Sequence, residues 1–320
     1  MNILPSQATP ILENYPRDPK LYGKVGVLMG GYAEYEVSLQ SGAEVLKALK
    51  EMGVDAHEVL VKPDNDWLKN IFAKNFNRVF IALHGKVGED GTVQAALELA
   101  AIPYTGSRVC PSMLAMHKLR SKQIWEVLGL PTLPYAELKE NFNPDEIIAK
   151  FGLPLAVKAC CSGSTLGITK VKQKEELAKA YAHAREFDDT VIVEPWTLGE
   201  EYTVPLLGTH ALPSIRIVPK QEFYDYKAKY IDDDTGFYCP SGLNEKEEKE
   251  IRDLAERAYA SLGCTQFGRA DFIRDTQGKF WLMEVNTIPG LTTHSLVPRS
   301  VKALGFTFTD LILSVLAMNL

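Results

Sequence analysis

The chain has 320 residues, of which 46% are hydrophobic and 24% are charged, so it can bury large cores and is long enough for two or three domains. Its formal net charge of −6 argues against a general nucleic-acid binder or a membrane-surface binder. Residues 1–20 contain four prolines and neither a long apolar run nor a basic start, so they match no signal peptide or membrane span, and we expect an irregular extension there.

The next part of the chain, residues 21–108, predicts an α/β domain. Residues 24–29 have the pattern of a buried strand, followed by Gly30-Gly31 and a helix that we expect from about Glu36 to Gly53. A second strand over residues 79–83 leads into a glycine-punctuated turn at residues 84–91. Alternation of strands and helices favours a parallel sheet.

Neither of two common phosphate-binding motifs is present in complete form. No G-x-x-x-x-G-K-[ST] loop is present. Gly30-Gly31 is similar to a dinucleotide turn but lacks the complete G-x-G-x-x-G spacing, so a nicotinamide dehydrogenase stays open only as an alternative.

A second unit is predicted over residues 109–200. A helix from Ser112 to Leu128 opens it, and strands over residues 155–158 and 191–194 flank a polar helix near 174–186. Lys158 ends the first of these strands and leads into a small-residue loop, 160–167, whose N–H groups could close over phosphate oxygens. The alternative is a simple hairpin turn.

The third unit, residues 201–320, contains a capped helix over 244–262 and a β-hairpin. If Asp275 and Gly278 flank its turn, Arg269 faces Glu284, and Asp271 lies diagonal to Glu284, about 7–8 Å away. Glu284 and Asn286 then share that face.

The side-chain oxygens of Asp271, Glu284 and Asn286 suit Mg²⁺, which takes one or two carboxylates together with substrate phosphates. The alternative is a solvated outer face on which Arg269 and Glu284 pair.

Four charged residues are candidate nucleotide partners, namely Lys118, Lys158, Glu194 and Glu201. The carboxylates cannot favour phosphates, but they can accept hydrogen bonds from an adenine amino group or from ribose hydroxyls. Five cysteines, an odd number with no C-x-x-C pair, predict a reduced cytoplasmic protein rather than a disulfide framework or a zinc site.

Taken together, several stretches resemble the D-alanine:D-alanine ligases of the ATP-grasp superfamily. The resemblance extends from about Lys24 onward, and its most specific stretches are Glu34–Ser38, His84–Thr92, Lys118–Lys122, Tyr224–Tyr230 and Glu284–Ser295. It implies a three-domain α/β architecture, parts of it α+β, in which ATP lies between the central and C-terminal domains. It also implies that a carboxylate is phosphorylated and that an amine then attacks the acyl phosphate, in a cytoplasmic step of peptidoglycan precursor synthesis.

For the nucleotide, the resemblance implies ATP and two Mg²⁺ or Mn²⁺ ions held by Asp271, Glu284 and Asn286, with Glu284 bridging. The residues that match phosphate contacts are Lys118, Lys158 and Lys229. Those that match the surroundings of adenine and ribose are Glu194, Trp196, Leu198 and Glu201.

For the amino acids, Glu34 matches the carboxylate that receives the first D-alanine's ammonium, and His84 matches a residue near that substrate's carboxylate. Arg269 and the N–H of Gly290 match the oxyanion stabilisers, and Ser295 matches the residue that binds the second D-alanine's carboxylate. Ser164 and Tyr230 match a pair that links the central loop to a lid near residues 224–240, and tyrosine at 230 favours amide over ester formation.

The expected partners are therefore D-alanine and ATP, with no nucleic acid and no membrane, and a homodimer is a further expectation. Besides the dehydrogenase, three alternatives stay open. Two are ligases of the same fold that make D-alanyl-D-lactate or D-alanyl-D-serine, and the third is a nucleotide-binding regulator without turnover. Two departures bear on the site: the segment between Gly31 and Glu34 is one residue short, and Cys160-Cys161 lies in the small-residue loop 160–167, here named the phosphate loop.

Overall fold

The computed structural model describes residues 3–63, 66–163, 167–219 and 235–320. In the N-terminal part, β1 (Lys24–Gly30) lies between β2 (Asp55–Val61) and β3 (Arg78–Ile81), all parallel, which confirms the predicted sheet. The helices that accompany these strands are α2 (Tyr35–Glu51), α3 (Asp66–Ala73) and α4 (Thr92–Leu99). Six of the seven β1 residues are buried, as a central strand with both faces covered requires.

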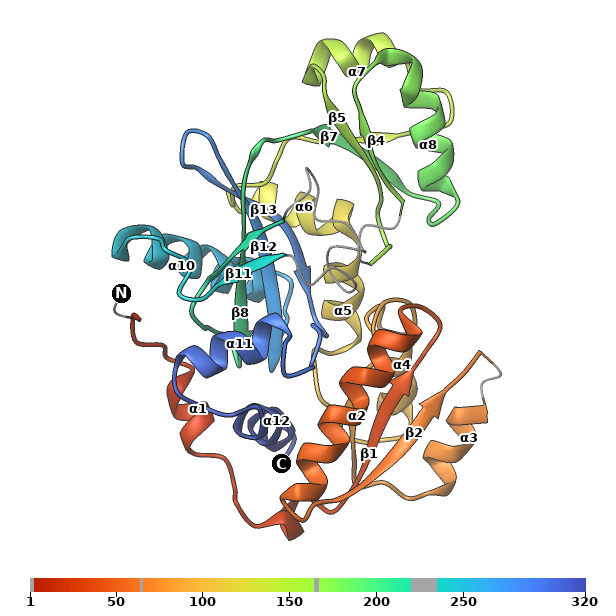
Figure 1. The fold of residues 1–320 in the computed structure, drawn as a ribbon. Coiled ribbons are helices and arrows are strands. Elements are labelled where there is room, and N and C mark those ends of the chain that lie inside the picture. Colours follow the sequence, from red (N-terminus) through yellow and green to blue (C-terminus); the bar gives the residue numbers. More distant parts are fainter. Residues whose placement is uncertain (1–2, 64–65, 164–166, 220–234) are drawn as a thin grey trace.

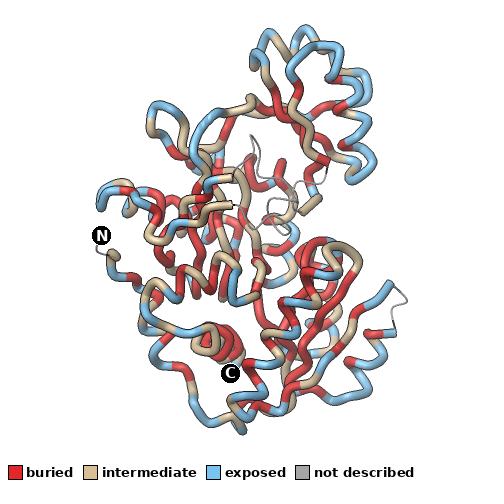
Figure 2. Tube along the Cα trace, in the orientation of Figure 1, coloured by how far each residue is buried: buried red, intermediate tan, exposed pale blue. Residues whose placement is uncertain are grey.

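The central part is an antiparallel sheet with the order β4-β7-β5-β6. Its strands are β4 (Ala136–Leu138), β5 (Leu155–Ala159), β6 (Ile168–Val171) and β7 (Val191–Pro195). The helical segments α7 (Pro144–Phe151), η2 (Lys174–Glu176) and α8 (Leu177–Arg185) accompany it, and α7 and α8 lie at the top of Figure 1. Figure 2 shows that the buried residues of this part follow the strands, whereas its outer helices are largely exposed.

The single helix predicted from Ser112 to Leu128 is wrong, because the segment forms two helices, α5 (Val109–Met116) and α6 (Lys118–Val127). His117 between them has φ −90° and ψ 91°, outside the helical region. The amide of Lys118 donates to the carbonyl of Cys160 at 3.1 Å instead of to the preceding turn. The break thus attaches the start of α6 to the phosphate loop.

The third sheet has six antiparallel strands in the order β11-β10-β8-β12-β13, with β9 paired to β8. Its strands are β8 (Gly199–Leu207), β9 (His210–Ala211), β10 (Ile215–Val218), β11 (Gly236–Tyr238), β12 (Phe267–Asp275) and β13 (Phe280–Asn286). The helices of this part are α10 (Glu245–Ser261), α11 (Leu296–Ala303) and α12 (Phe308–Ala317). Asn244 and Glu247 form the capping box that begins α10.

The predicted hairpin forms from β12 and β13, but its predicted register is wrong. Arg269 pairs with Asn286, and Asp271 pairs directly with Glu284. The amide of Asp275 donates to the carbonyl of Lys279 at 2.9 Å, so the turn has three residues, with Gly278 at φ +86°. A bulge between Asp271 and Phe272 then shifts the pairing by one more residue.

The N-terminal extension is less irregular than predicted, since it forms α1 (Thr9–Glu13) and the 3₁₀ helix η1 (Pro19–Tyr22). Ser6 Oγ donates to the carbonyl of Ala211 at 2.6 Å, and Tyr15 Oη donates to Asp310 at 2.6 Å, so the extension packs along the C-terminal part. Among the described residues no single helix is long and apolar enough to cross a membrane. The helices α11 and α12, which are bent relative to each other, reach that length and apolar composition only when they are counted together. The domain boundaries stay predictions.

Candidate functional site

One cavity of about 690 Å³ lies where the three parts of the chain meet. It brings together residues that the sequence places far apart, and most of the predicted site residues line it. These are Glu34, Lys118, Lys158, Glu194, Trp196, Leu198, Glu201, Arg269, Asp271, Glu284, Asn286, Gly290 and Ser295. Ser164, Lys229 and Tyr230, with most of the predicted lid, lie outside the described residues.

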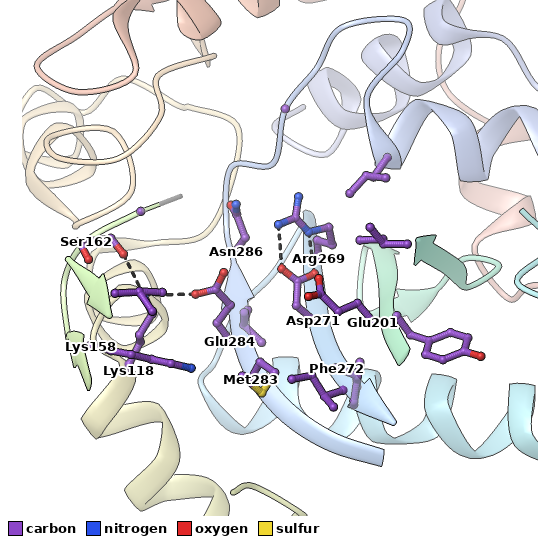
Figure 3. Close-up of a pocket in the computed structure, with 18 of the residues that line it drawn as sticks. Lys118, Lys158, Ser162, Glu201, Arg269, Asp271, Phe272, Met283, Glu284 and Asn286 are labelled. Atoms are coloured by element: carbon purple, nitrogen blue, oxygen red, sulfur yellow. Dashed lines mark hydrogen bonds and ion pairs between the residues drawn. The ribbon is translucent and has the colours of Figure 1, made fainter. Parts of the chain in front are cut away.

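The hairpin carries its polar side chains on the face that lines the cavity (Figure 3). Arg269 holds Asp271 through two hydrogen bonds, Nε to Oδ1 and NH2 to Oδ2, each 2.8 Å. Thr203 Oγ1 on β8 donates to the same Asp271 Oδ1 at 2.6 Å. The proposed pair of Arg269 with Glu284 is therefore wrong, because the register places Asn286 opposite Arg269.

Glu284 has a different cationic partner, Lys118 at the start of α6. Lys118 Nζ lies 3.2 Å from Glu284 Oε2 and donates to the carbonyl of Ser162 at 2.8 Å. Burial opposes the charge on Lys118, yet the Glu284 carboxylate prevails and raises the pKa of this lysine. One ammonium thus joins the phosphate loop to the hairpin.

A third pair lies deeper in the central sheet. Glu194 on β7 is 1% exposed, its Oε1 is paired with Lys158 on β5, and its Oε2 lies 2.8 Å from Lys122 Nζ. Burial by itself would raise the pKa of Glu194, but Lys122 and Lys158 reverse the shift and lower it to about 2. The carboxylate therefore stays charged throughout the neutral range.

The loop after β7 forms one wall of the cavity. The amide of Trp196 donates to the carbonyl of Pro154 at 2.9 Å, and Lys170 Nζ lies 4.6 Å from the centre of the Trp196 ring. The Leu198 side chain is 65% exposed, so it is free to pack against a ligand.

Sequence reasoning missed the apolar walls between these polar groups. Ile168 contributes from the central sheet, whereas Phe272 and Met283 contribute from the hairpin. Their only signal is proximity in sequence to predicted site elements, since Phe272 and Met283 adjoin Asp271 and Glu284, and Ile168 follows the loop 160–167. Apolar walls with a few convergent polar groups are typical of small-molecule sites.

Glu34 begins α2 in the left-handed conformation, with φ 48° and ψ 38°. Such a conformation is uncommon for a residue other than glycine. A Cβ added at Gly163 would lie 2.9 Å from Glu34 Oε1, so the phosphate loop passes close to this carboxylate. Although the segment between Gly31 and Glu34 is one residue short, Glu34 lines the cavity.

His84 differs from the other predicted site residues because it does not line the cavity. It is 3% exposed, and its Nε2 and Nδ1 atoms each lie 3.0 Å from a partner, Ser41 Oγ and the carbonyl of Ile288. Glu89 Oε1 is 3.7 Å from Nδ1. Burial disfavours the charged ring, but Glu89 and Glu34 overcome this and raise the pKa of His84.

The segment that ends in α11 presents Gly290 and Ser295 to the cavity. Ser295 Oγ accepts from the amide of Thr292 at 3.0 Å and lies 2.8 Å from Thr292 Oγ1. A Cβ at Gly290 would lie 3.0 Å from Ser295 Oγ, so the absence of a side chain at Gly290 leaves room for the Ser295 hydroxyl beside it.

The donor set of the hairpin fits a small hard cation. Asp271 and Glu284 lie opposite each other, and Asn286 adds an amide oxygen on the same strand as Glu284. The described part of the chain contains no cluster of three or more His, Cys, Asp and Glu side chains that could hold a metal by itself. Two carboxylates and one amide leave coordination positions for water and phosphate, as Mg²⁺ requires.

Comparison with known proteins gives a consistent result along the chain. A family model described as the D-ala D-ala ligase C-terminus matches residues 124–317, and one described as the D-ala D-ala ligase N-terminus matches residues 68–107. A D-alanine–D-alanine ligase from Laribacter hongkongensis is 49% identical over 296 residues, which cover 92% of this chain and 96% of that protein.

Solved structures with the same fold include enzymes of two specificities. The D-alanine–D-alanine ligase from Bacillus anthracis has a TM-score of 0.82 and 34% identity over 91% of this chain and 95% of its own, and its complex with ATP has a TM-score of 0.81 and 32% identity over the same shares. The VanG D-Ala:D-Ser ligase from Enterococcus faecalis has a TM-score of 0.80 and 31% identity over 93% of this chain and 99% of its own.

Proposed function

The chain belongs to the D-alanine–D-alanine ligase family, and from that premise we propose how its residues join two D-alanine molecules at the expense of ATP. The enzyme serves peptidoglycan synthesis. The observation that carries the residue assignment is the cavity in which the three ion pairs meet, Lys118 with Glu284, Lys158 with Glu194, and Arg269 with Asp271. Each pair supplies a cation for phosphate or a carboxylate for a metal.

ATP occupies the side of the cavity bounded by β5, β7 and the hairpin. Trp196 and Leu198 border the base, and Glu201 accepts hydrogen bonds from the ribose. Lys118 and Lys158 turn toward the phosphates. Asp271, Glu284 and Asn286 would hold Mg²⁺, whose positive charge would there offset the negative charge of the phosphates.

The first D-alanine binds with its ammonium near Glu34, and its carboxylate attacks the γ-phosphorus of ATP, so that ADP leaves and a D-alanyl phosphate forms. The amine of the second D-alanine then attacks the acyl carbon, and phosphate leaves. Arg269 and the Gly290 N–H stabilise the oxyanion, and Ser295 orients the second carboxylate. His84 acts from behind the cavity, since its bond to the Ile288 carbonyl positions the segment that reaches Gly290.

The phosphate loop and the hairpin also exclude water from the acyl phosphate, because hydrolysis would waste the ATP. Lys118 supports this, since it bonds to Ser162 in the loop and lies beside Glu284 in the hairpin. Ser164, Lys229 and Tyr230 keep their roles as predictions. A cytoplasmic location and a homodimer are likewise predictions.

Glu284→Gln tests the assignment, because it keeps the shape of the side chain but removes a negative charge that would help to hold the metal. We expect kcat for ADP release with D-alanine to fall about 1000-fold. Glu58→Gln, an exposed change on β2, is the matched control and should keep normal turnover. Near-normal turnover of Glu284→Gln in Mg²⁺ would contradict the metal assignment.

The same assay tests substrate choice when D-lactate or D-serine is offered as the acceptor beside D-alanine. The enzyme should release ADP fastest with D-alanine alone. Binding of ATP without any D-alanine-dependent phosphate release would instead favour a regulator.

A further inference from the structure

Lys122 has no role in the proposed mechanism, yet it is among the most deeply buried charged residues of the described chain. It lies on α6 with 1% exposure and does not line the cavity. Its Nζ is 2.8 Å from Glu194 Oε2, 2.9 Å from Thr132 Oγ1 and 3.4 Å from the carbonyl of Leu133. A lysine is rarely buried unless it is paired.

Glu194 thus has an ammonium on each side, Lys158 toward the cavity and Lys122 away from it. One carboxylate cannot fully compensate two buried ammonium groups. Consistent with this, burial and the charge of Lys158 outweigh Glu194 and lower the pKa of Lys122. The cluster carries an excess of positive charge before any ligand binds.

The excess positive charge of this cluster matters when a nucleotide binds. Lys158 must give up part of its interaction with Glu194 to bind a phosphate, and a buried carboxylate left without a counter-ion is strongly destabilised. Lys122 stays in place behind Glu194 because Thr132 and Leu133 also hold it. It can therefore balance Glu194 alone while Lys158 turns to the ligand.

We infer that Lys122 is a positioning residue that acts as the standing counter-ion of Glu194, so that Lys158 is free to bind a phosphate of ATP. The inference rests on the proposed nucleotide site. Without Lys122, Glu194 and Lys158 would form a neutral buried pair that ATP has to break.

The same lysine is connected to the metal hairpin. Thr132 Oγ1 accepts from Lys122 and donates to the carbonyl of Leu282 on β13 at 3.2 Å. The amide of Leu282 donates to the carbonyl of Pro131 at 2.8 Å. Lys122 thus fixes Glu194 relative to the strand that carries Glu284 and Asn286.

The test measures the Kd of ATP by calorimetry and the kinetic constants of three single variants first. Lys122→Met should raise the Kd and the KM for ATP at least about 10-fold and change kcat much less, because breaking a buried pair weakens binding before chemistry begins. Lys122→Arg keeps the charge and should stay within about 3-fold of wild type. Lys179→Met removes an exposed positive charge from α8 and controls for net charge, with no change expected.

The decisive comparison uses the Glu194→Gln background. If Lys122 acts by balancing Glu194, then Lys122→Met should change the Kd of ATP less than about 2-fold once the carboxylate is gone. An equal effect in both backgrounds would overturn the inference, because Lys122 would then act through packing. A loss of kcat with an unchanged Kd would overturn it too.

The wild-type protein provides a measurement that does not depend on how variants fold. With ¹³C-labelled lysine and a non-hydrolysable ATP analogue bound, the Lys122 Cε resonance, assigned by its absence from Lys122→Arg, should stay that of a charged ammonium from pH 6 to 9. A neutral Lys122 in the complex would overturn the inference.

Lys158→Met separates this inference from the proposed function. If ATP still binds and Lys158→Met leaves its Kd unchanged, the proposed phosphate site is wrong. If Lys158→Met weakens binding and Lys122→Met does not, only the counter-ion role of Lys122 is wrong.

Discussion

The two halves of the cavity are built from different interactions. On the nucleotide side, ammonium and guanidinium groups pair with carboxylates, as in Lys118 with Glu284 and Arg269 with Asp271. On the amino-acid side, hydrogen bonds hold the segment that carries Gly290 and Ser295, chiefly the one that its Leu291 amide donates to Ser41 and the one between its Ile288 carbonyl and His84.

The difference follows from what each half has to bind. ATP and Mg²⁺ bring large charges, so their protein partners must be charged yet balanced before the ligands arrive, and ion pairs provide this. The amino acids need placement in a small volume, which backbone hydrogen bonds across the domains provide. Changes on the nucleotide side should therefore affect chemistry, whereas those on the amino-acid side should affect stability and D-alanine affinity.

Arg269→Lys should have a larger effect than any change on the amino-acid side. Lysine cannot reproduce the two parallel bonds to Asp271 or a planar contact to the oxyanion, so kcat should fall about 100-fold while the fold persists. Steady-state kinetics with D-alanine would measure this. Arg108→Lys is the matched control, because Arg108 forms an exposed pair with Glu98, and it should leave kcat unchanged. If Arg108→Lys lowered kcat as much as Arg269→Lys, the loss could not be assigned to the site.

Ser41→Ala should act mainly on stability. Ser41 Oγ lies 3.0 Å from His84 Nε2 and accepts from the amide of Leu291 at 3.3 Å, so its loss leaves two buried groups without a partner. We expect the free energy of unfolding to fall by about 1–3 kcal/mol and the KM for D-alanine to rise more than kcat falls.

The control for Ser41→Ala is Ser112→Ala. Ser112 is equally buried but bonds locally, to the carbonyl of Ser107 at 3.2 Å, so its loss should leave the KM for D-alanine unchanged. A Ser41→Ala variant with normal D-alanine KM but reduced kcat would contradict the division between the two halves.

The smallest expected effect is a pH dependence confined to the amino-acid side. The groups that face His84 are Glu89, Glu34, Ser41 and the Ile288 carbonyl, and the carboxylates raise its pKa despite its burial. A raised pKa in the folded state means that the charged ring stabilises the fold below the unfolded pKa, about 6.5, and that this contribution is lost as the pH rises through the folded value.

Urea unfolding of wild type and Glu89→Gln would measure that contribution. The difference in free energy of unfolding, about 1 kcal/mol, should be widest below about pH 6.5 and should narrow at higher pH. A difference that grows with pH would mean that His84 is neutral in the folded protein. Glu194, whose pKa is lowered to about 2, should contribute no such change near neutrality.

Local sequence patterns predicted the kinds of element and the kinds of side chain at the site. Alternation and turn residues predicted the hairpin, the buried apolar run predicted β1, and the cap at residue 244 predicted the start of α10. These predictions succeeded because hydrophobic periodicity, helix capping and turn formation depend on neighbours within a few residues. The resemblance supplied the reaction from the same local motifs.

Tertiary structure decided the pairings. A three-residue turn and a bulge placed Asp271 opposite Glu284, and the bond from Lys118 to Cys160 divided one predicted helix into α5 and α6. Only the packed molecule places Lys122 behind Glu194 and His84 behind the cavity wall. The partner of a buried charge is set by segments that lie far apart in the sequence, and no local pattern encodes it.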